Sequence, residues 1–197
     1  MRIPNLLSVS SRLVLPALLL MLVLLPACSV NVKKSDNGED KKVDISTPLG
    51  GIHVNNNADV RDTGLPVYPG ARPKLKEREG DEKSANVDIS SFGFSLKVVA
   101  VEYESDDPPS KVVAYYQDVL KNKYGSVLQC HSEGHNFKYN PSGESKELKC
   151  EGDGNGKNVE LKVGTEENQH IVSIQPETNG SSFALVYVHT KGKEGSI

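Results

Sequence analysis

The sequence predicts an α+β fold, in which a mostly antiparallel β-sheet carries one main amphipathic helix packed on one face. Three stretches support this prediction. Residues 94–103 are typical of a strand, residues 108–124 carry the one good helical pattern, and alternation with period two resumes after residue 126. A single helix that follows a strand and precedes a run of strands is typical of an α+β domain.

The first 27 residues are typical of an export signal. Arg2 and Arg12 precede an apolar run over residues 13–25. A basic start, a short apolar core and a small residue, here Ala27, before the cleavage point predict a signal peptide over residues 1–27. As a helix, the apolar run would reach roughly 20 Å, short of the roughly 30 Å that a membrane-spanning helix needs.

The remaining body of the protein is mildly acidic. The whole chain has 23 basic and 26 acidic residues, and removal of Arg2 and Arg12 with the signal changes the formal charge from −3 to −5. Because nucleic-acid phosphates require a basic face, this charge argues against a nucleic-acid partner. The sequence has one long apolar run, which excludes a protein with several membrane-spanning helices.

The residues Leu25-Pro26-Ala27-Cys28 resemble the lipobox of bacterial lipoprotein precursors. In that family the cysteine sulfur receives a diacylglycerol, a peptidase cleaves the bond before the cysteine, and the new amino group is usually acylated. The resemblance therefore implies cleavage between Ala27 and Cys28, with covalent diacylglycerol and an N-acyl lipid on Cys28. It implies membrane lipid as a partner and no other cofactor.

The same resemblance implies a location in the cell envelope. In bacteria with two membranes, Asp after the lipidated cysteine tends to retain such proteins at the inner membrane, whereas here Ser29 follows Cys28. We therefore expect the outer membrane, facing the periplasm, if the cell has one. Each buried methylene contributes about 0.8 kcal/mol, so two or three acyl chains hold a protein durably.

After the anchor, residues 28–42 predict the lipidated cysteine and a flexible tether. Residues 29–42 are polar, of mixed charge and nearly free of large apolar groups, so they cannot bury enough surface to offset the entropy of ordering. Residues 43–46 and 52–55 alternate weakly on either side of a Pro-Gly turn, and they predict a hairpin.

Residues 56–85 carry turn formers and charges, and we expect them to form a partly ordered linker. Within them, Tyr68-Pro69-Gly70-Ala71 predicts a type II turn, because Pro fixes φ and Gly accepts a positive φ. The sequence therefore predicts five parts: a signal peptide over 1–27, an anchor and tether over 28–42, a hairpin and linker over 43–85, an α+β globular domain over 86–190 and a disordered tail over 191–197.

The strand over residues 94–103 changes phase in its middle. Its apolar residues occupy one face first and then the other: Phe94, Leu96 and Val98, followed by Val99, Val101 and Tyr103. Either a bulge lies near residues 98–99, or the middle of the strand is covered on both faces.

The helical pattern that follows has clear ends and an apolar stripe. Asp106 or Asp107 is expected to cap the helix, Pro108 suits its first turn, and Gly125 is expected to end it. The residues that fall on one side of the helix, and are expected to face the core, are Val112, Val113, Tyr116, Val119 and Leu120.

Beyond the helix, short alternating runs predict strands. They cover residues 126–131, 146–151, 158–163, 169–175 and 182–190. Residues 183–188 are apolar on both faces, which predicts a central strand in the sheet.

The cysteine count favours a disulfide. With Cys28 lipidated, Cys130 and Cys150 remain as an even pair in an exported protein. Cys130 shares phase with Leu128, and Cys150 shares phase with Leu148, so both cysteines are expected to point inward from neighbouring strands. Two buried thiols are the alternative, and a redox site is disfavoured because no Cys-x-x-Cys motif occurs.

Motifs for catalysis or metal binding are weak. His131 and His135 are four residues apart, which would suit zinc on a helix, but Gly134 and the preceding strand argue against a helix there. No His-Glu-x-x-His, Walker loop or Gly-x-Ser-x-Gly elbow occurs. We therefore expect no catalytic residue and no metal, with His131 and His135 as weak candidates, and we expect that the protein is not an enzyme.

Residues 65–125 also resemble segments of uncharacterised bacterial lipoproteins, in which a Tyr-Pro-Gly-Ala turn precedes a strand, an acidic-Pro junction and a Tyr-rich helix. That resemblance brings no activity. The sequence as a whole predicts a lipid-anchored cell-envelope protein that acts as a non-catalytic binding or structural module of unknown ligand. The alternatives are an envelope enzyme or metal-binding protein, and a subunit of an envelope complex.

Overall fold

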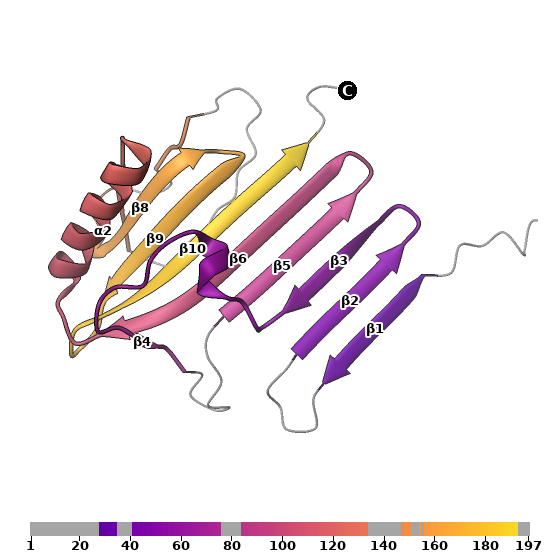
Figure 1. Ribbon diagram of the computed structural model, residues 1–197, viewed down its shortest axis with the longest axis horizontal. Helices are drawn as coiled ribbons and strands as arrows, with labels where there is room; N and C mark the ends of the chain where they lie inside the picture. The colour runs from indigo at the N-terminus through magenta and orange to yellow at the C-terminus, as the bar shows by residue number, and fades with distance from the viewer. Residues whose placement is uncertain are drawn as a thin grey trace, which may run out of the picture.

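The structure, a computed structural model, describes residues 28–34, 41–75, 84–133, 147–150, 154 and 156–192. In these ranges a single α-helix packs against one antiparallel sheet (Figure 1). The elements are β1 (Ser29–Lys34), β2 (Lys41–Thr47), β3 (Gly50–Asn55), the 3-10 helix η1 (Val60–Thr63), β4 (Arg72–Pro73), β5 (Ser84–Ser91), β6 (Phe94–Ser105), α2 (Pro109–Tyr124), β7 (Leu128–Ser132), β8 (Asn158–Thr165), β9 (Asn168–Pro176) and β10 (Ser181–Gly192). The strand order is β1-β2-β3-β5-β6-β10-β9-β8-β7, with β4 paired to β6. The predicted α+β class and the antiparallel sheet are confirmed.

The start of the predicted tether is a strand. Ser29–Lys34 form β1, which pairs with β2 so that Val30 lies opposite Ile45. The prediction of a flexible segment is wrong here, because pairing with β2 satisfies one edge of the main chain and aligns apolar side chains across the two strands. Composition alone does not reveal such a partner. Residues 35–40 and the predicted signal peptide, with Ala27, lie outside the described residues.

The predicted hairpin is confirmed as β2 and β3, which pair with Thr47 opposite Gly50. The predicted boundary between linker and domain after residue 85 is wrong. β5 begins at Ser84 and pairs with β3 on one side and β6 on the other, so the hairpin and the domain share one sheet. The strand was missed because residues 84–91 alternate small and polar residues with only a few apolar ones.

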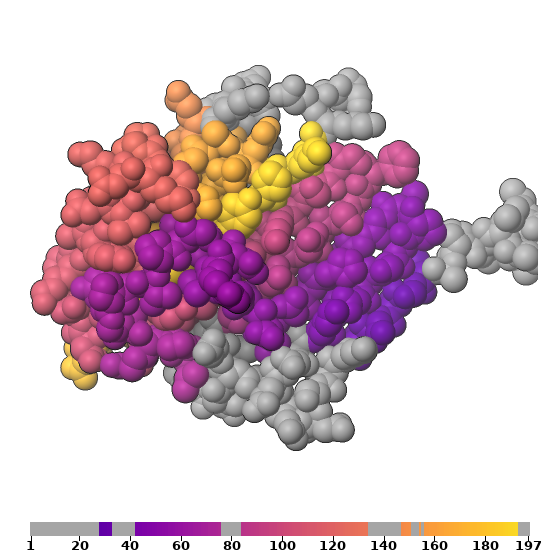
Figure 2. Space-filling view, viewed as in Figure 1, coloured from indigo at the N-terminus to yellow at the C-terminus, as the bar shows by residue number. Residues whose placement is uncertain are grey.

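Part of the predicted linker is ordered against the sheet. The Tyr68 turn is confirmed, since the Ala71 N–H donates a 3.0 Å hydrogen bond to the Tyr68 carbonyl. Leu65 and Tyr68 are buried in the same core as the residues of α2. In Figure 2 this segment lies beside α2 and covers the middle of the sheet. Residues 76–83 lie outside the described residues.

The helix ends as predicted but begins differently. The Gly125 N–H donates a 2.9 Å hydrogen bond to the Lys121 carbonyl and closes α2. The N-cap is Pro108, and no side chain caps the first turn, so the predicted cap by Asp106 or Asp107 is wrong. Both carboxylates are held by other partners. None of the helices in the described residues is long and apolar enough to cross a membrane.

Of the residues predicted to face the core, Val112, Tyr116 and Leu120 are fully buried. The other two, Val113 and Val119, are half-buried, and Val113 packs against the core. α2 packs against β8, β9 and β10, while η1 packs against β6 and β10.

Strand pairing divides the side chains between two faces, which we call the helix face (against which α2 packs) and the reverse face. Val99, Val101 and Tyr103 of β6 are buried in the core on the helix face. Leu96 and Val98 lie on the reverse face, and the register of β6 with both neighbours is continuous. The change of phase in β6 is therefore no bulge, but a change in the face that carries apolar residues.

That change extends to the first strands of the sheet. The pairing places a band of apolar residues on the reverse face of β1, β2, β3 and β5: Val30, Val32, Val43, Ile45, Ile52, Val54, Val87 and Ile89. On the helix face the same strands carry polar residues, such as Asp44, His53 and Asp88. The first strands thus carry their apolar residues on the reverse face, whereas β9 and β10 carry apolar residues on both faces, with Ile171 and Val188 buried on the reverse face.

The later strands largely agree with the prediction. β7, β8, β9 and β10 cover the runs predicted near them, and β10 is central, with β6 and β9 on either side. Residues 147–150 are not a strand, so the strand predicted over residues 146–151 is wrong. β10 continues to Gly192, two residues into the predicted tail, while residues 193–197 lie outside the described residues.

Candidate functional site

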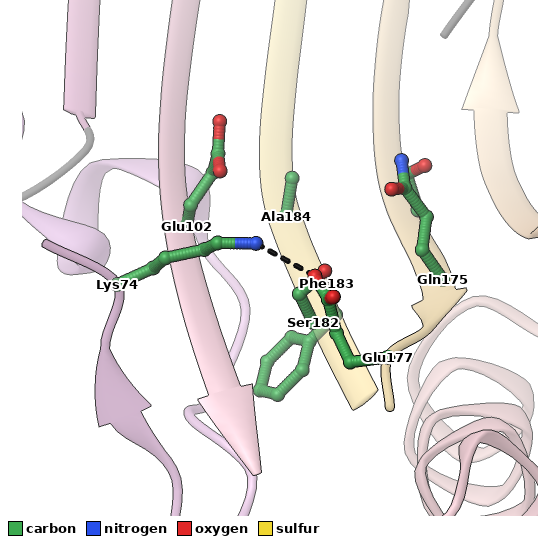
Figure 3. Close-up of a pocket in the computed structure, with 8 residues that line it drawn as sticks. Lys74, Glu102, Gln175, Glu177, Ser182, Phe183 and Ala184 are labelled. Carbon is green, nitrogen blue, oxygen red and sulfur yellow. Dashed lines mark hydrogen bonds and ion pairs between the residues drawn. The ribbon is translucent and has the colours of Figure 1, made fainter. Parts of the chain in front are cut away.

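A polar hollow lies where β6, β9 and β10 run side by side, on the reverse face of the sheet. It has a volume of about 300 Å³. We call it the polar hollow, and its lining residues are Lys74, Glu102, Ser173, Gln175, Glu177, Ser182, Phe183 and Ala184 (Figure 3).

The sheet register builds the floor of the hollow. Ala184 of β10 lies directly between Glu102 of β6 and Ser173 of β9. Ser182 lies two residues before Ala184 in β10, opposite Gln175. Because paired residues in a sheet point to the same side, these polar side chains share one face, and the small side chain of Ala184 leaves space between them.

Lys74 closes one side of the hollow. Its main-chain N–H donates a 2.9 Å hydrogen bond to the Glu102 carbonyl, which continues the pairing of β4 with β6. Its ammonium lies 2.8 Å from a carboxylate oxygen of Glu177, as the dashed line in Figure 3 shows. The turn that carries Glu177 is itself held by a 3.2 Å hydrogen bond from the Glu177 N–H to the Gly180 carbonyl.

A second ion pair lies beside the hollow. Arg72 contacts Asp106 at 3.0 Å and Glu104 at 3.4 Å. Hydrogen bonds from the Arg72 guanidinium lower the pKa of the Asp106 carboxyl below its ordinary value. These pairs fix the segment around β4 against the end of β6.

The hollow is lined mainly by polar and charged groups. The lining combines one ammonium with two carboxylates, two hydroxyls and one amide. Among these residues, neither Ser173 nor Ser182 has a His that would serve as its base. This balance of charge favours a small neutral, hydroxylated ligand or a cationic one over an anion.

Cys28 lies at the opposite end of the sheet. It is exposed and directly precedes β1, whose first residue, Ser29, pairs with Ser46. The register continues from Ser46 through Gly51 and Ser90 to Ser95 near the start of β6. Glu102, in the polar hollow, lies seven residues further along β6, which corresponds to roughly 23 Å at 3.3 Å per residue.

The predicted disulfide is confirmed, because Cys130 and Cys150 are bonded to each other. Cys130 is buried in β7, as expected. Cys150 is exposed and lies outside any strand, so the expectation that both cysteines point inward is wrong for it. The bond ties residues 147–150 to β7, the last strand of the sheet path.

Of the two weak metal candidates, only His131 lies among the described residues. His131 pairs with the Gln129 side chain at 3.0 Å, and His135 lies outside the described residues. In the part of the chain that the structure describes, no three His, Cys, Asp or Glu side chains are placed to hold a metal ion.

Another histidine has a structural partner. The His170 ring nitrogen Nδ1 lies 2.7 Å from the Thr63 carbonyl, to which it donates a hydrogen bond. Burial lowers the pKa of His170 below its ordinary value, so the ring is held neutral beside this acceptor.

No local pattern in the sequence indicates the polar hollow. Lys74 and Glu177 are 103 positions apart in the chain, and the other lining residues are ordinary strand residues. No protein-family model, curated protein or solved structure matches the chain.

Proposed function

We propose that the protein is a lipid-anchored cell-envelope protein and acts as a non-catalytic binding module. In this proposal Cys28 carries diacylglycerol and an N-acyl lipid, and the polar hollow binds a small polar ligand. The lipobox resemblance of residues 25–28 supports the anchor, and the exposure of Cys28 supports its accessibility for acylation. The favoured location is the outer membrane, facing the periplasm, if the cell has one.

The single observation that carries the proposal is the placement of Cys28 and the polar hollow at opposite ends of the sheet. Acyl chains on Cys28 hold that end of the sheet at the bilayer. The hollow, roughly 23 Å further along the strands, then lies in the aqueous phase where small solutes reach it. A disulfide between Cys130 and Cys150 suits the oxidising compartment outside the inner membrane.

The charge of the hollow supports a ligand with hydroxyl or ammonium groups. Glu102 and Glu177 accept hydrogen bonds from such groups, and Ser173 and Ser182 supply further polar contacts. The volume of about 300 Å³ is at the lower end for ligand sites, so the ligand is small.

Membrane fractionation with mass measurement of the amino-terminal peptide tests the anchor. The wild-type protein should sediment with membranes, and its first peptide should begin at an acylated Cys28. The Cys28→Ser chain should be unprocessed or soluble. A control chain with Cys130→Ser and Cys150→Ser should still be acylated. An unmodified Cys28 on a chain that salt releases from membranes contradicts the anchor.

Binding of small probes tests the hollow. We suggest glucose and spermidine as probes of the hydroxylated and cationic classes, followed by the NMR shifts of amides in β6, β9 and β10. The Ala184→Leu variant fills the floor of the hollow and should abolish the shifts. The Val186→Leu variant adds a methylene on the same face of β10 outside the lining and should leave them unchanged. Shifts that survive Ala184→Leu would place the ligand elsewhere.

A further inference from the structure

The end of the sheet that carries Cys28 also presents exposed apolar side chains at two turns. Leu49, in the turn between β2 and β3, is 70% exposed, and Phe92, in the turn between β5 and β6, is 87% exposed. Exposed large apolar residues that gather in one place mark an interaction site.

The register brings the two turns to the same end of the molecule as Cys28. Thr47 pairs with Gly50, Gly50 with Ser91, and Ser91 with Phe94, so both turns project beyond one row of the sheet. Cys28 precedes Ser29, which lies in the adjacent row. Figure 1 shows the β2–β3 and β5–β6 turns and the start of β1 at the same end of the strands.

Apolar residues on the reverse face extend this surface. Val30 is 64% exposed, and Ile52 and Phe94 are each 38% exposed. All three lie on the reverse face, in the rows nearest the two turns. We call the surface formed by Val30, Leu49, Ile52, Phe92 and Phe94 the apolar end.

The segments that form the apolar end carry no charged side chain. Residues 28–32, 45–52 and 89–96 contain no Asp, Glu, Lys or Arg, although 25% of the whole chain is charged. Contact with lipid therefore desolvates no ionised side chain of these segments. The main chain of β2, β3 and β5 is paired on both sides, whereas β1 is the edge strand of the described sheet and pairs with β2 alone.

We propose that the apolar end inserts into the interfacial layer of the bilayer that holds the lipidated Cys28. This proposal rests on the proposed function, which supplies the acyl chains. The acyl chains hold the protein at the membrane, and Leu49 and Phe92 fix its orientation. The strands then point away from the bilayer, and the polar hollow opens into the aqueous phase.

A bilayer fits this surface better than a second copy of the chain does. The two most exposed residues are at the tips of projecting turns, whereas face-to-face packing of two sheets buries flat faces. The adjacent Cys28 also places lipid within about two residues, or roughly 7 Å, of Val30.

The chain has no tryptophan, so a single introduced indole reports on its own surroundings. Phe92→Trp and Leu49→Trp place the indole at the apolar end in two independent variants. Leu75→Trp is the matched control, because Leu75 is also exposed, at 53%, but follows Lys74 at the opposite end of the sheet.

Each variant is purified from membranes as the processed protein and reconstituted in phosphatidylethanolamine–phosphatidylglycerol vesicles with brominated acyl chains. The Phe92→Trp and Leu49→Trp proteins should show blue-shifted emission, quenched at least about twofold by bromine, while the Leu75→Trp protein should show neither effect. Equal quenching at both ends, or none at the apolar end, overturns the proposal.

Two further measurements separate the ways in which the proposal fails. Mass measurement of the same samples reads acylation. Acylated protein that floats with vesicles but shows no quenching at the apolar end leaves the proposed function intact and overturns the insertion. If Cys28 is not acylated, the proposed function fails, and quenching of the same indoles at saturating vesicles still decides the insertion. A dimer in sedimentation that Leu49→Ser with Phe92→Ser dissociates, with no quenching, assigns the surface to a second copy and overturns the proposal.

Discussion

The hydroxyl of Tyr116, in the middle of α2, donates a 3.0 Å hydrogen bond to the main-chain carbonyl of Pro66. Tyr116 is fully buried, and its ring lies 5.7 Å from that of Phe183 in β10. One side chain thus joins the helix, the segment before β4 and the centre of the sheet. This segment leads into Lys74, so the same contact supports the position of the polar hollow.

Loss of the Tyr116 hydroxyl should destabilise the protein. Tyr116→Phe keeps the ring but removes the donor of this part-buried hydrogen bond, which should cost about 1 kcal/mol of the free energy of unfolding. The neighbouring Tyr115 is only half-buried, and Tyr115→Phe should cost less. Urea denaturation of the two variants and the wild type measures the difference. Equal midpoints for all three would contradict the argument.

The same tyrosine should make the protein sensitive to high pH. Burial raises the pKa of the Tyr116 hydroxyl well above its ordinary value of 10.0. Above that value the unfolded chain loses a proton that the folded chain retains, so stability is complete below pH 10 and falls as the pH rises beyond it. Denaturation midpoints between pH 9 and pH 11 should fall more steeply in the wild type than in Tyr116→Phe. Parallel curves would show that Tyr116 ionises alike in both states.

The features that were predicted correctly depend on residues that are adjacent in the chain. The turn at Tyr68 and the end of α2 at Gly125 each depend on a few adjacent residues, and both are confirmed. The phase change in β6 was visible in the sequence as well. The sequence left open whether this phase change was a bulge. The pairing of β6 with β5 and β10 shows instead that the apolar residues change face there.

The parts that the sequence did not predict depend on distant partners. β1 is polar in composition and is ordered by its pairing with β2, and β5 is ordered by pairing with β3 and β6. Asp107 looked like a helix cap from its position before Pro108. In the structure it accepts a 2.8 Å hydrogen bond from the Tyr68 hydroxyl, 39 residues away in the chain, instead of capping α2. The polar hollow likewise joins residues from separate strands, and no local pattern marks them.

The carboxylate of Asp59 should titrate at unusually low pH. It accepts hydrogen bonds from the side chain and from the main-chain N–H of Arg61, and the side-chain bonds contribute most to lowering the pKa of Asp59 to about 2. Arg61→Ala removes the side-chain bonds but keeps the main-chain one, so the pKa should return only part of the way toward 3.8. Carbon NMR of the carboxyl group during titration measures it.

Arg72→Ala is the matched control for that titration. It should leave Asp59 unchanged and raise the pKa of Asp106, which the Arg72 guanidinium lowers. Because the folded pKa of Asp59 lies below that of the unfolded chain, its contribution to stability is present above pH 4 and is lost as the pH falls toward 2. A carboxyl carbon shift of Asp59 that titrates with a pKa near 3.8 in the wild type would contradict the assigned contacts.

The Cys130–Cys150 disulfide should stabilise the fold through the chain that it closes. The two cysteines are 20 residues apart, and a loop of this length contributes roughly 3 kcal/mol in the chain-entropy description. Addition of reductant should lower the denaturation midpoint of the wild type to that of Cys130→Ala with Cys150→Ala. The double variant should not respond to reductant. A wild-type midpoint that reductant leaves unchanged would show that the bond adds little.

The turn between β9 and β10 should not tolerate a side chain at Gly180. This residue has φ of +98°, and a Cβ there would lie 2.1 Å from the Ser105 carbonyl oxygen. Gly125 has a similar φ of +87° but no atom within 4 Å of its Cβ position, so it is the matched control. Gly125→Ala should cost about 1–3 kcal/mol through backbone strain alone, because Gly125 has φ of 87° and ψ of −84°.

Gly180→Ala adds a clash with main-chain atoms that cannot move aside without disturbing the pairing of Ser181 with Ser105. Its cost should therefore exceed that of Gly125→Ala by at least about 2 kcal/mol. Because Ser182 and Glu177 flank this turn, the Gly180→Ala protein should also lose probe binding in the polar hollow, while the Gly125→Ala protein retains it. Thermal unfolding and the probe-dependent NMR shifts measure the two effects. Equal destabilisation by the two substitutions would mean that the turn moves freely away from β6, and that the hollow is not held in place by it.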